Sequence, residues 1–343
     1  MNQHFIKKLE IQRFKCFDEL FADGLKRVNL ITGKNNAGKT ALMEAINFYI
    51  NSRSIADASE SLKKLISRRQ KTRSIELDIM HKDSSNMKLK INGNIIKVKF
   101  HNELNAEHMH STHRRYDDAD APFLEISTNG DNKILPVNYI LQGYSPMRRM
   151  RREFDEGNNC NFISSGISSD EEISILYGTM VESNAEHLLD DSLKLLDKDI
   201  VALKQIILKR GVTLKLLLKN KHSVLLSSMG EGVSKYIEII TAIWASKEGY
   251  LFIDELDNGI HHSKLDELWN MILTTSKKLN VQVFATTHSK ECIESYVRVT
   301  KKLNEKKVAL IRLNKRKDDS IFASVFDFKT LQDAIDQEHE VRG

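Results

Sequence analysis

Residues 33–40 contain the residue types that bind a phosphate chain. Their sequence is GKNNAGKT, which has the spacing G-x-x-x-x-G-K-T. Glycines let the backbone approach a ligand closely, and the N–H groups of such a loop attract anions. The lysine can reach the β- and γ-phosphates of a nucleotide, and the threonine hydroxyl can ligate Mg²⁺. We therefore predict that ATP and Mg²⁺ bind here, through Gly33, Asn35, Asn36, Ala37, Gly38, Lys39, Thr40 and Ala41.

The residues on either side of this loop predict the elements that phosphate binding requires. Residues 28–32 form an apolar run that predicts a strand, and residues 41–49 carry apolar side chains at helical spacing. A strand before the loop and a helix after it bring the positive end of the helix to the phosphates. The simpler alternative is a chance glycine turn with a surface lysine, and the flanking elements argue against it.

Two carboxylates, Asp254 and Glu255, end the apolar run 250–253. Alone, such a pair can be no more than the solvated end of a strand. Together with the phosphate loop it predicts a Walker B motif, in which Asp254 holds Mg²⁺ through water. Glu255 is then placed to orient or deprotonate the attacking water, which a nucleotide hydrolase needs.

A second apolar strand, predicted over 281–286, leads into the sequence Thr-Thr-His-Ser. Ligands of open α/β sheets bind at the carboxyl ends of the strands. We therefore predict that His288 donates a hydrogen bond to the γ-phosphate and joins Glu255 and Lys39 as a catalytic residue. Away from a strand end, a lone histidine would more simply be structural or exposed.

The elements that must position these residues alternate along the chain. Helices over 231–246 and 264–279 and strands over 250–254 and 281–286 indicate a parallel α/β sheet. The Asn-Gly pair at 92–93, between two alternating runs, predicts a β-hairpin. Short strands are predicted over 212–218 and 222–226. A helix is predicted over 184–209 because six apolar residues are spaced by three or four: Leu189, Leu193, Leu196, Ile200, Leu203 and Ile207.

Composition narrows the class of protein. The chain has 343 residues, of which 41% are hydrophobic and 29% charged, with no apolar run long enough for a membrane span and no secretory signal at the N-terminus. The three cysteines have neither metal-site nor disulfide spacing, so we expect a cytoplasmic protein without a membrane partner. The net charge of +5 is compatible with DNA as a partner. The basic residues in 147–152 fit a phosphate backbone, a solvated helix face or an acidic partner equally well.

The phosphate loop, the acidic pair and the strand-end histidine, in this order, resemble the ABC ATPase superfamily. The more specific resemblance is to the short AAA-labelled ATPases of the RecF/SMC/OLD-like group, found in prokaryotic DNA maintenance and phage defence. Residues 9–17 resemble the first strand of that group, and residues 324–342 resemble its usual ending. The resemblance implies an α/β P-loop NTPase fold, an ABC-ATPase head with a mixed sheet and an inserted helical/β lobe. It implies one domain over 1–343, with its core in 1–50 and 210–343 and the lobe in about 51–209.

The segment SSMGEG at 227–232 occupies the place of the Ser-Gly-Gly-Gln signature of ABC proteins. The resemblance implies that Ser228 and Gly230 contact the γ-phosphate bound to another copy of the chain. Nucleotide would then be sandwiched in a homodimer or a higher homo-oligomer. Met229 and Glu231 depart from the pattern, and a serine that merely caps the following helix is the simpler alternative.

Two further positions bear on the resemblance. His261 stands where many ABC proteins have an aspartate, which resembles the OLD-like branch and makes a transporter an unfavourable interpretation. Gln142 follows an apolar run and is the candidate for the Q-loop glutamine near Mg²⁺.

Three functions are consistent with these observations. The first is an ATP-hydrolysing switch whose nucleotide-dependent dimer controls a separate effector, a nuclease or toxin acting in trans, in phage defence. The stretch after His288 lacks the acidic cluster of a Toprim nuclease, so the effector is expected on another chain. The alternative is a RecF-like ATPase that binds DNA in repair or maintenance. A scaffold without hydrolysis is disfavoured by Lys39, Asp254, Glu255 and His288.

Overall fold

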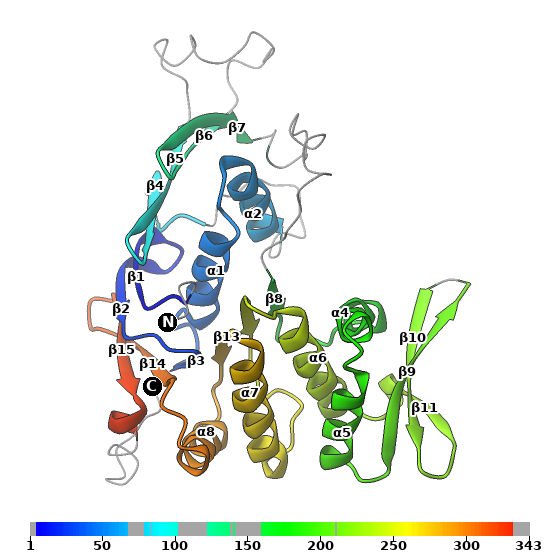
Figure 1. Ribbon diagram of the computed structural model, residues 1–343. Helices are drawn as coiled ribbons and strands as arrows, with labels where there is room; N and C mark the ends of the chain where they lie inside the picture. Colours follow the sequence, from blue (N-terminus) through cyan, green and yellow to red (C-terminus); the bar gives the residue numbers. More distant parts are fainter. Residues whose placement is uncertain are drawn as a thin grey trace.

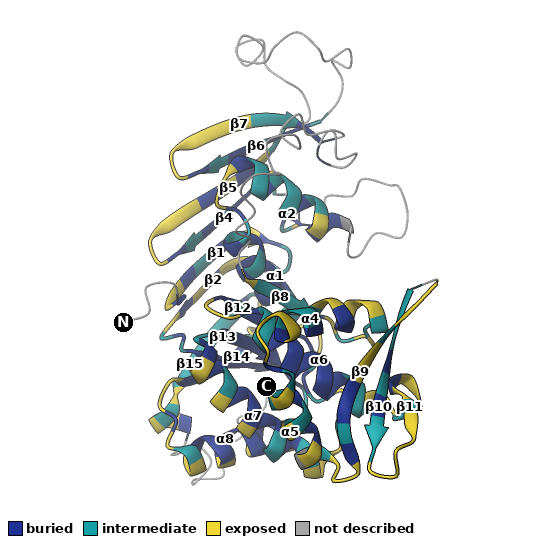
Figure 2. Ribbon diagram, turned by 45° about the vertical axis from the view of Figure 1, so that its right-hand side comes forward, coloured by how far each residue is buried: buried dark blue, intermediate teal, exposed yellow. Residues whose placement is uncertain are grey.

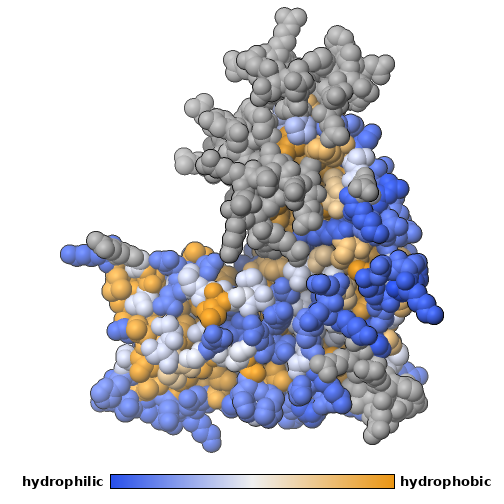
Figure 3. Space-filling model, turned by 180° about the vertical axis from the view of Figure 1, so that it is seen from behind, coloured by the Kyte–Doolittle hydropathy of each residue, from blue (hydrophilic) through white to orange (hydrophobic). Residues whose placement is uncertain are grey.

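The computed structural model describes residues 5–67, 79–82, 84–101, 122–137, 140, 159–209 and 211–331. Three β-sheets and a set of helices make up this part of the chain (Figure 1). None of its helices combines the length and the hydropathy that crossing a membrane requires. Single large apolar side chains such as Ile175 and Ile207 are exposed, as is ordinary for a protein surface. Figure 3 shows hydrophobic residues scattered among hydrophilic ones over the lower part of one face.

The core sheet has six strands in the order β15-β14-β3-β13-β12-β8. All neighbouring pairs are parallel except β14 and β15, so the predicted α/β fold with a mixed sheet is confirmed. The strands are β3 (Val28–Gly33), β8 (Cys160–Ile163), β12 (Tyr250–Ile253), β13 (Gln282–Thr286), β14 (Val308–Lys315) and β15 (Ile321–Asp327). The predicted strands over 28–32, 250–254 and 281–286 are therefore confirmed. The strand at 160–163, which was not predicted, forms the edge beside β12.

Helices cover both faces of the core sheet (Figures 1 and 2). One face carries α1 (Lys39–Ile50), and α2 (Ile55–Ser67) lies between α1 and strands β6 (Phe123–Thr128) and β7 (Asp131–Pro136) of a second sheet. The other face carries α6 (Glu231–Ala245), α7 (Leu265–Leu279) and α8 (Lys290–Leu303). Helices α4 (Asp170–Glu182) and α5 (Glu186–Leu196) pack against α6. The helices predicted over 41–49, 231–246 and 264–279 are confirmed.

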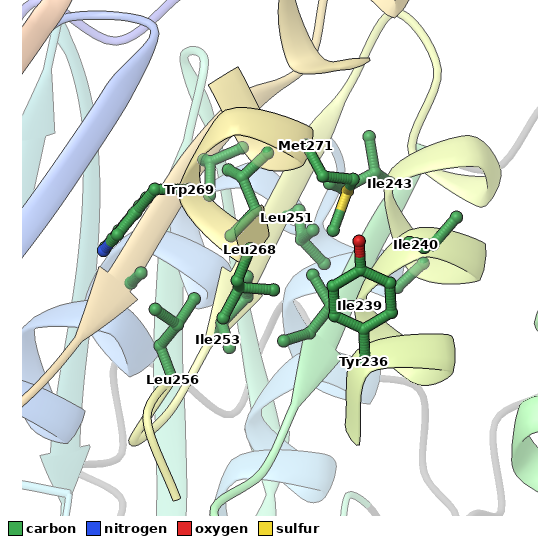
Figure 4. Close-up of a cluster of buried hydrophobic side chains, with 14 of the residues drawn as sticks. Tyr236, Ile239, Ile240, Ile243, Leu251, Ile253, Leu256, Leu268, Trp269 and Met271 are labelled. Carbon is green, nitrogen blue, oxygen red and sulfur yellow. The ribbon is translucent and has the colours of Figure 1, made fainter. Parts of the chain in front are cut away.

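Strand side chains alternate between these two layers, because successive residues of a strand point to opposite faces. Phe252 and Phe284 belong to the core on the α1 side. Leu251 and Ile253 belong to the core on the α6 and α7 side, where they meet Trp269 and Tyr236 (Figure 4). Burial on both faces explains why these strands are continuous apolar runs in the sequence.

A second sheet is antiparallel, with the order β2-β1-β4-β5-β6-β7. It contains β1 (Lys8–Phe14), β2 (Phe17–Asp23), β4 (Asn86–Ile91), β5 (Asn94–His101), β6 (Phe123–Thr128) and β7 (Asp131–Pro136). The predicted hairpin is confirmed: Asn92 and Gly93 join β4 to β5 with φ values of 48° and 97°. Strand β2 lies beside β15, so this sheet adjoins the core sheet at its edge.

The third sheet corrects one prediction. The helix predicted over 184–209 is wrong beyond Leu196, where α5 ends. Residues Ile200–Leu208 form strand β9, which pairs with β10 (Gly211–Leu218), and β10 pairs with β11 (Ser223–Leu225). The apolar residues at 200, 203 and 207 continue the helical spacing by coincidence. Pairing with the leucine-rich β10 favours the strand instead, since tertiary context overrides a weak local preference.

Stacked phenylalanines on the α1 side of the core sheet lead to a prediction about stability. Phe252 is fully buried, with ring centroids 5.3 Å from Phe284 and 5.7 Å from Phe162. Phe252→Ala removes this packing and leaves a cavity, so we expect a loss of about 3–5 kcal/mol in the free energy of unfolding. Urea denaturation measures the loss. Ile175→Ala, at a position that is 74% exposed, serves as control and should cost less than about 0.5 kcal/mol.

Candidate nucleotide site

The phosphate loop connects β3 to α1 at the carboxyl end of the core sheet. Helix α1 begins at Lys39, and Gly38 caps it in a left-handed conformation with φ 88°. A Cβ atom at Gly38 would lie 2.6 Å from Cys16 Sγ and 2.8 Å from the ring of Phe17. Only glycine fits, because both the conformation and the space exclude a side chain. The turn between β1 and β2 thus fixes the loop from outside and leaves the helix N-terminus open to an anion.

The Lys39 side chain points back across the loop that precedes it. Its Nζ donates hydrogen bonds to the carbonyl oxygens of Gly33 at 2.9 Å and Lys34 at 3.0 Å. Lys39 is buried, and this burial lowers the pKa of its ammonium group despite the opposing effect of Asp254 and Glu255. The ammonium group is therefore held inside the loop, where a phosphate chain enclosed by the loop would meet it.

Two hydroxyl groups hold the carboxylate of Asp254. Thr40 Oγ1 donates to Asp254 Oδ2 at 3.1 Å, and Thr286 Oγ1 donates to Asp254 Oδ1 at 2.7 Å. A hydroxyl and a carboxylate side by side are the hard oxygen ligands that suit Mg²⁺. In the described part of the chain no three His, Cys, Asp or Glu side chains gather as a metal cage. The donor set thus fits a Mg²⁺ ion that takes its remaining ligands from phosphate and water.

Glu255 leaves the end of β12 with an unusual backbone conformation. Its φ is +49°, in the left-handed region that a glutamate seldom adopts. The conformation is held by the N–H of Glu255, which donates to Thr286 Oγ1 at 2.8 Å, and by the N–H of Leu256, which donates to the carbonyl oxygen of Thr286 at 2.9 Å. Such over-determined strain is typical of functional sites. The side chain is half-buried, so water can reach its carboxylate.

His288 lies against Lys39, with Nδ1 3.2 Å from the lysine Nζ. An ammonium group only donates, so Nδ1 is the acceptor and the neutral ring carries its proton on Nε2. Burial and the neighbouring Lys39 lower the pKa of His288, which favours the neutral ring. Next to it, Thr287 Oγ1 donates to Asp257 and Ser289 caps α8, so both flanking residues are anchored. The acceptor role of Nδ1 thus places the ring proton on Nε2, beside the phosphate loop.

A pocket of about 510 Å³ opens on the surface beside the phosphate loop and His288. It is lined by Thr32, Gly33, Lys34, Asn35, Thr287, His288 and Ile293. The structure thus brings Lys39, Thr40, Asp254 and His288 together, with Asn35 at the pocket wall and Asn36 exposed on the loop. Ala37 and Ala41 are buried beneath the loop and anchor it.

Ser228 and Gly230 do not join this cluster. They are exposed, at the end of a short 3₁₀ helix (Leu226–Ser228) beside β10 and at the cap of α6. Helix α6, which Gly230 caps, packs against β8. Strand β8 is three strands from β3, or about 14 Å at the usual spacing of 4.8 Å, so the segment is far from the phosphate loop. Gln142 and the basic residues 147–152 lie outside the described residues.

One contributor to the site was not assigned a role from the sequence. Thr286 bridges Asp254 and Glu255, and its position just before Thr287 and His288 at a strand end was the available signal.

Strand β8 also supports the site, because the N–H of Asp254 donates to the carbonyl oxygen of Ile163 at 2.8 Å. Residues 161–166 resemble a segment common in the RecF/SMC/OLD-like ATPase group, but no role was assigned to them from the sequence. The strand has only four residues, too short for its periodicity to be recognised.

The bridging role of Thr286 can be tested directly. Thr286→Val keeps the shape but removes the hydroxyl that orients Asp254 and holds Glu255. Loss of such a supporting group typically costs 10- to 100-fold in metal affinity. We expect the Mg²⁺ concentration that half-saturates nucleotide binding to rise by about that factor, measured with a fluorescent ATP analogue. Thr274→Val should leave this concentration unchanged, because the Thr274 hydroxyl donates to the carbonyl oxygens of Asn270 and Met271 within α7.

Comparison with known proteins agrees with this geometry. Residues 28–294 match the AAA_21 family, described as "AAA domain, putative AbiEii toxin, Type IV TA system". An ATP/GTP phosphatase of Helicobacter pylori is 26% identical over 330 residues, covering 84% of this chain and 86% of the relative. An uncharacterized protein of Methanocaldococcus jannaschii is 41% identical over 66 residues, covering 19% of this chain and 58% of that protein.

Solved structures supply the fold. The crystal structure of the Smc head bound to the C-winged helix domain of ScpA is similar with a TM-score of 0.53 and 14% identity. The similarity covers 96% of this chain and 99% of that one. The predicted resemblance to AAA-labelled ATPases is thereby confirmed by the family, and the resemblance to SMC proteins is confirmed by the fold. The chain belongs to the AAA_21 family of AAA-domain ATPases, and its fold is that of the SMC head.

Proposed function

We propose that the chain hydrolyses ATP in a nucleotide sandwich between two copies, and that this dimer is a switch for a separate effector protein in phage defence. One observation carries the proposal. The residues suited to binding phosphates and water lie together: Lys39, Thr40, Asp254 and His288. Ser228 lies apart from them, beside β10 and beyond the edge strand β8. A head-to-tail dimer brings the Ser228 segment of one copy over the phosphate loop of the other.

Each residue has a separate role in the proposed reaction. Lys39 and the loop N–H groups bind the β- and γ-phosphates. Thr40 and Asp254 would hold Mg²⁺, which neutralises charge on the phosphates when bound. Glu255 accepts a proton from the attacking water or orients it in line with the bond to be broken.

His288 and the partner copy complete the site. The Nε2–H of His288 donates to a γ-phosphate oxygen, on which negative charge rests in the transition state. Ser228, Gly230 and the N-terminus of α6 approach the same phosphate from the partner. Only ATP, and not ADP, joins both copies, so hydrolysis dissolves the contacts that favour the dimer.

One relative supports the chemistry, and the family description supports the setting. The Helicobacter pylori protein is named for phosphatase activity on ATP and GTP, and its similarity spans most of both chains. The family description mentions a toxin of a type IV toxin–antitoxin system, which supports a defence role with an effector.

The dimer is tested with Glu255→Gln, which keeps the nucleotide site but removes the base. We expect its solution mass, measured by light scattering, to double on addition of ATP and Mg²⁺ but not of ADP. Ser228→Arg in the same background should prevent the rise, because a large cation then occupies the place of a small hydroxyl. A mass that stays constant, or a rise that survives Ser228→Arg, would contradict the sandwich.

The pH dependence of hydrolysis tests His288. Burial and the neighbouring Lys39 lower its pKa, so at neutral pH the ring is neutral and Nδ1 accepts from Lys39. As pH falls through this lowered pKa, protonation removes the acceptor and sets two cations side by side. We expect the turnover rate to fall in the acidic range and to stay level from neutral to mildly basic pH. His288→Gln should have a lower turnover rate at pH 7.5, and its pH–rate profile should lack the fall on the acidic side. If the variant shows the same acidic fall as wild type, the fall belongs to another group.

A further inference from the structure

A lysine and a glutamate are buried together on α6, the helix that follows Gly230. Lys235 and Glu238 are 6% and 4% exposed, and Lys235 Nζ lies 3.7 Å from Glu238 Oε2. Burial lowers the pKa of Lys235 and raises the pKa of Glu238, and each partner opposes the shift of the other. The roles assigned above for binding and hydrolysis do not use this pair.

Both side chains bind the segment that follows β8. Lys235 Nζ donates to the carbonyl oxygen of Ser164 at 2.7 Å, and Glu238 Oε1 accepts from Ser168 Oγ at 2.5 Å. Ser164 comes directly after Ile163, whose carbonyl oxygen accepts the N–H of Asp254. Lys235 thus binds the residue next to the one whose carbonyl oxygen positions Asp254.

The residues that follow Glu255 contact both the segment after β8 and the start of α6. Asn258 Nδ2 donates to the carbonyl oxygen of Ser165 at 3.0 Å. Gly232, on the first turn of α6, packs directly against the Gly259 carbonyl, where a Cβ atom would collide. The first two turns of α6 therefore contact both the segment that follows β8 and the segment that follows β12.

Stability alone does not explain the buried pair. Replacing a buried ion pair by apolar residues of similar volume is often neutral or stabilising, whereas removing one partner is strongly destabilising. An apolar pair would pack α6 equally well, but it would not bind the Ser164 carbonyl or the Ser168 hydroxyl. The pair therefore adds a directional link between α6 and the segment after β8.

We propose that Lys235 and Glu238 are positioning residues that couple the nucleotide site of each chain to its own Ser228–Gly230 segment. The inference rests on the proposed dimer. Nucleotide bound at Asp254 displaces the adjoining residues 164–168, and Lys235 and Glu238 transmit the displacement to α6. The N-terminus of α6 then meets the partner's nucleotide in a changed position. The two sites of the dimer consequently hydrolyse ATP cooperatively.

The test compares two double variants. Lys235→Met with Glu238→Leu replaces the pair by apolar side chains and should keep the melting temperature. Arg27→Met with Glu305→Leu is the matched control, because Arg27 and Glu305 form a similarly buried pair, 2.6 Å apart, at the opposite end of β3. The readouts are the Hill coefficient of ATP hydrolysis and the affinity of dilute single chains for a fluorescent ATP analogue.

The expected result separates coupling from folding and from binding. Wild type and control should give a Hill coefficient above 1, with an upper limit of about 2 set by the number of sites. The Lys235/Glu238 variant should give a Hill coefficient of about 1. Nucleotide affinity and melting temperature should be alike in all three. Lys235→Arg, which keeps a cation able to reach the carbonyl, should restore most of the cooperativity. Asn258→Ala, at an exposed position, should lower the Hill coefficient without affecting the fold.

Two outcomes would overturn the inference in distinguishable ways. If Glu255→Gln dimerises with ATP but the Lys235/Glu238 and Asn258 variants keep the wild-type Hill coefficient, the coupling does not pass through these residues and the sandwich still stands. If Glu255→Gln shows no ATP-dependent rise in mass, the proposed dimer fails and the coupling fails with it.

Discussion

The nucleotide site depends on the parallel register of four strands. β3, β13, β12 and β8 run in one direction, so their carboxyl ends meet at one edge of the core sheet. Ile31 pairs with Thr286, and Ile253 pairs with both Ala285 and Ile163. Residues from four distant parts of the sequence therefore emerge side by side. A shift of one residue in any pair would turn its polar side chains to the opposite face of the sheet.

Within that edge, the polar groups hold one another. Thr286 donates to Asp254 and accepts from Glu255, while Lys39 donates to His288 and to two carbonyl oxygens of the loop. Lys39, Asp254 and His288 each have a side-chain partner on another strand or loop, which is the arrangement that buried polar groups require. The site is preorganised, since its geometry comes from the fold and does not need the nucleotide to assemble it.

Local patterns were sufficient for much of the fold and for the residues of the phosphate loop, because glycine spacing and apolar runs have direct physical causes. The helix predicted over 184–209 failed where a helical spacing continued by chance into β9, whose conformation depends on pairing with β10. Strand β8 was not predicted because four residues carry no period. Thr286 and the Lys235–Glu238 pair are recognised only through contacts with residues far along the chain. Such contacts follow from topology, which single-sequence periodicity does not contain.

The pairing partners of β3 have a consequence for how the protein is made. β3 lies between β13 and β14, which the ribosome synthesises more than 200 residues later. During translation the phosphate loop exists long before either neighbour, and closing these non-local contacts is a slow step of folding. An incomplete chain that ends before residue 282 has the whole loop sequence but no strand on either side of β3. Nascent or prematurely terminated chains therefore lack an assembled nucleotide site until almost all of the described chain has been synthesised.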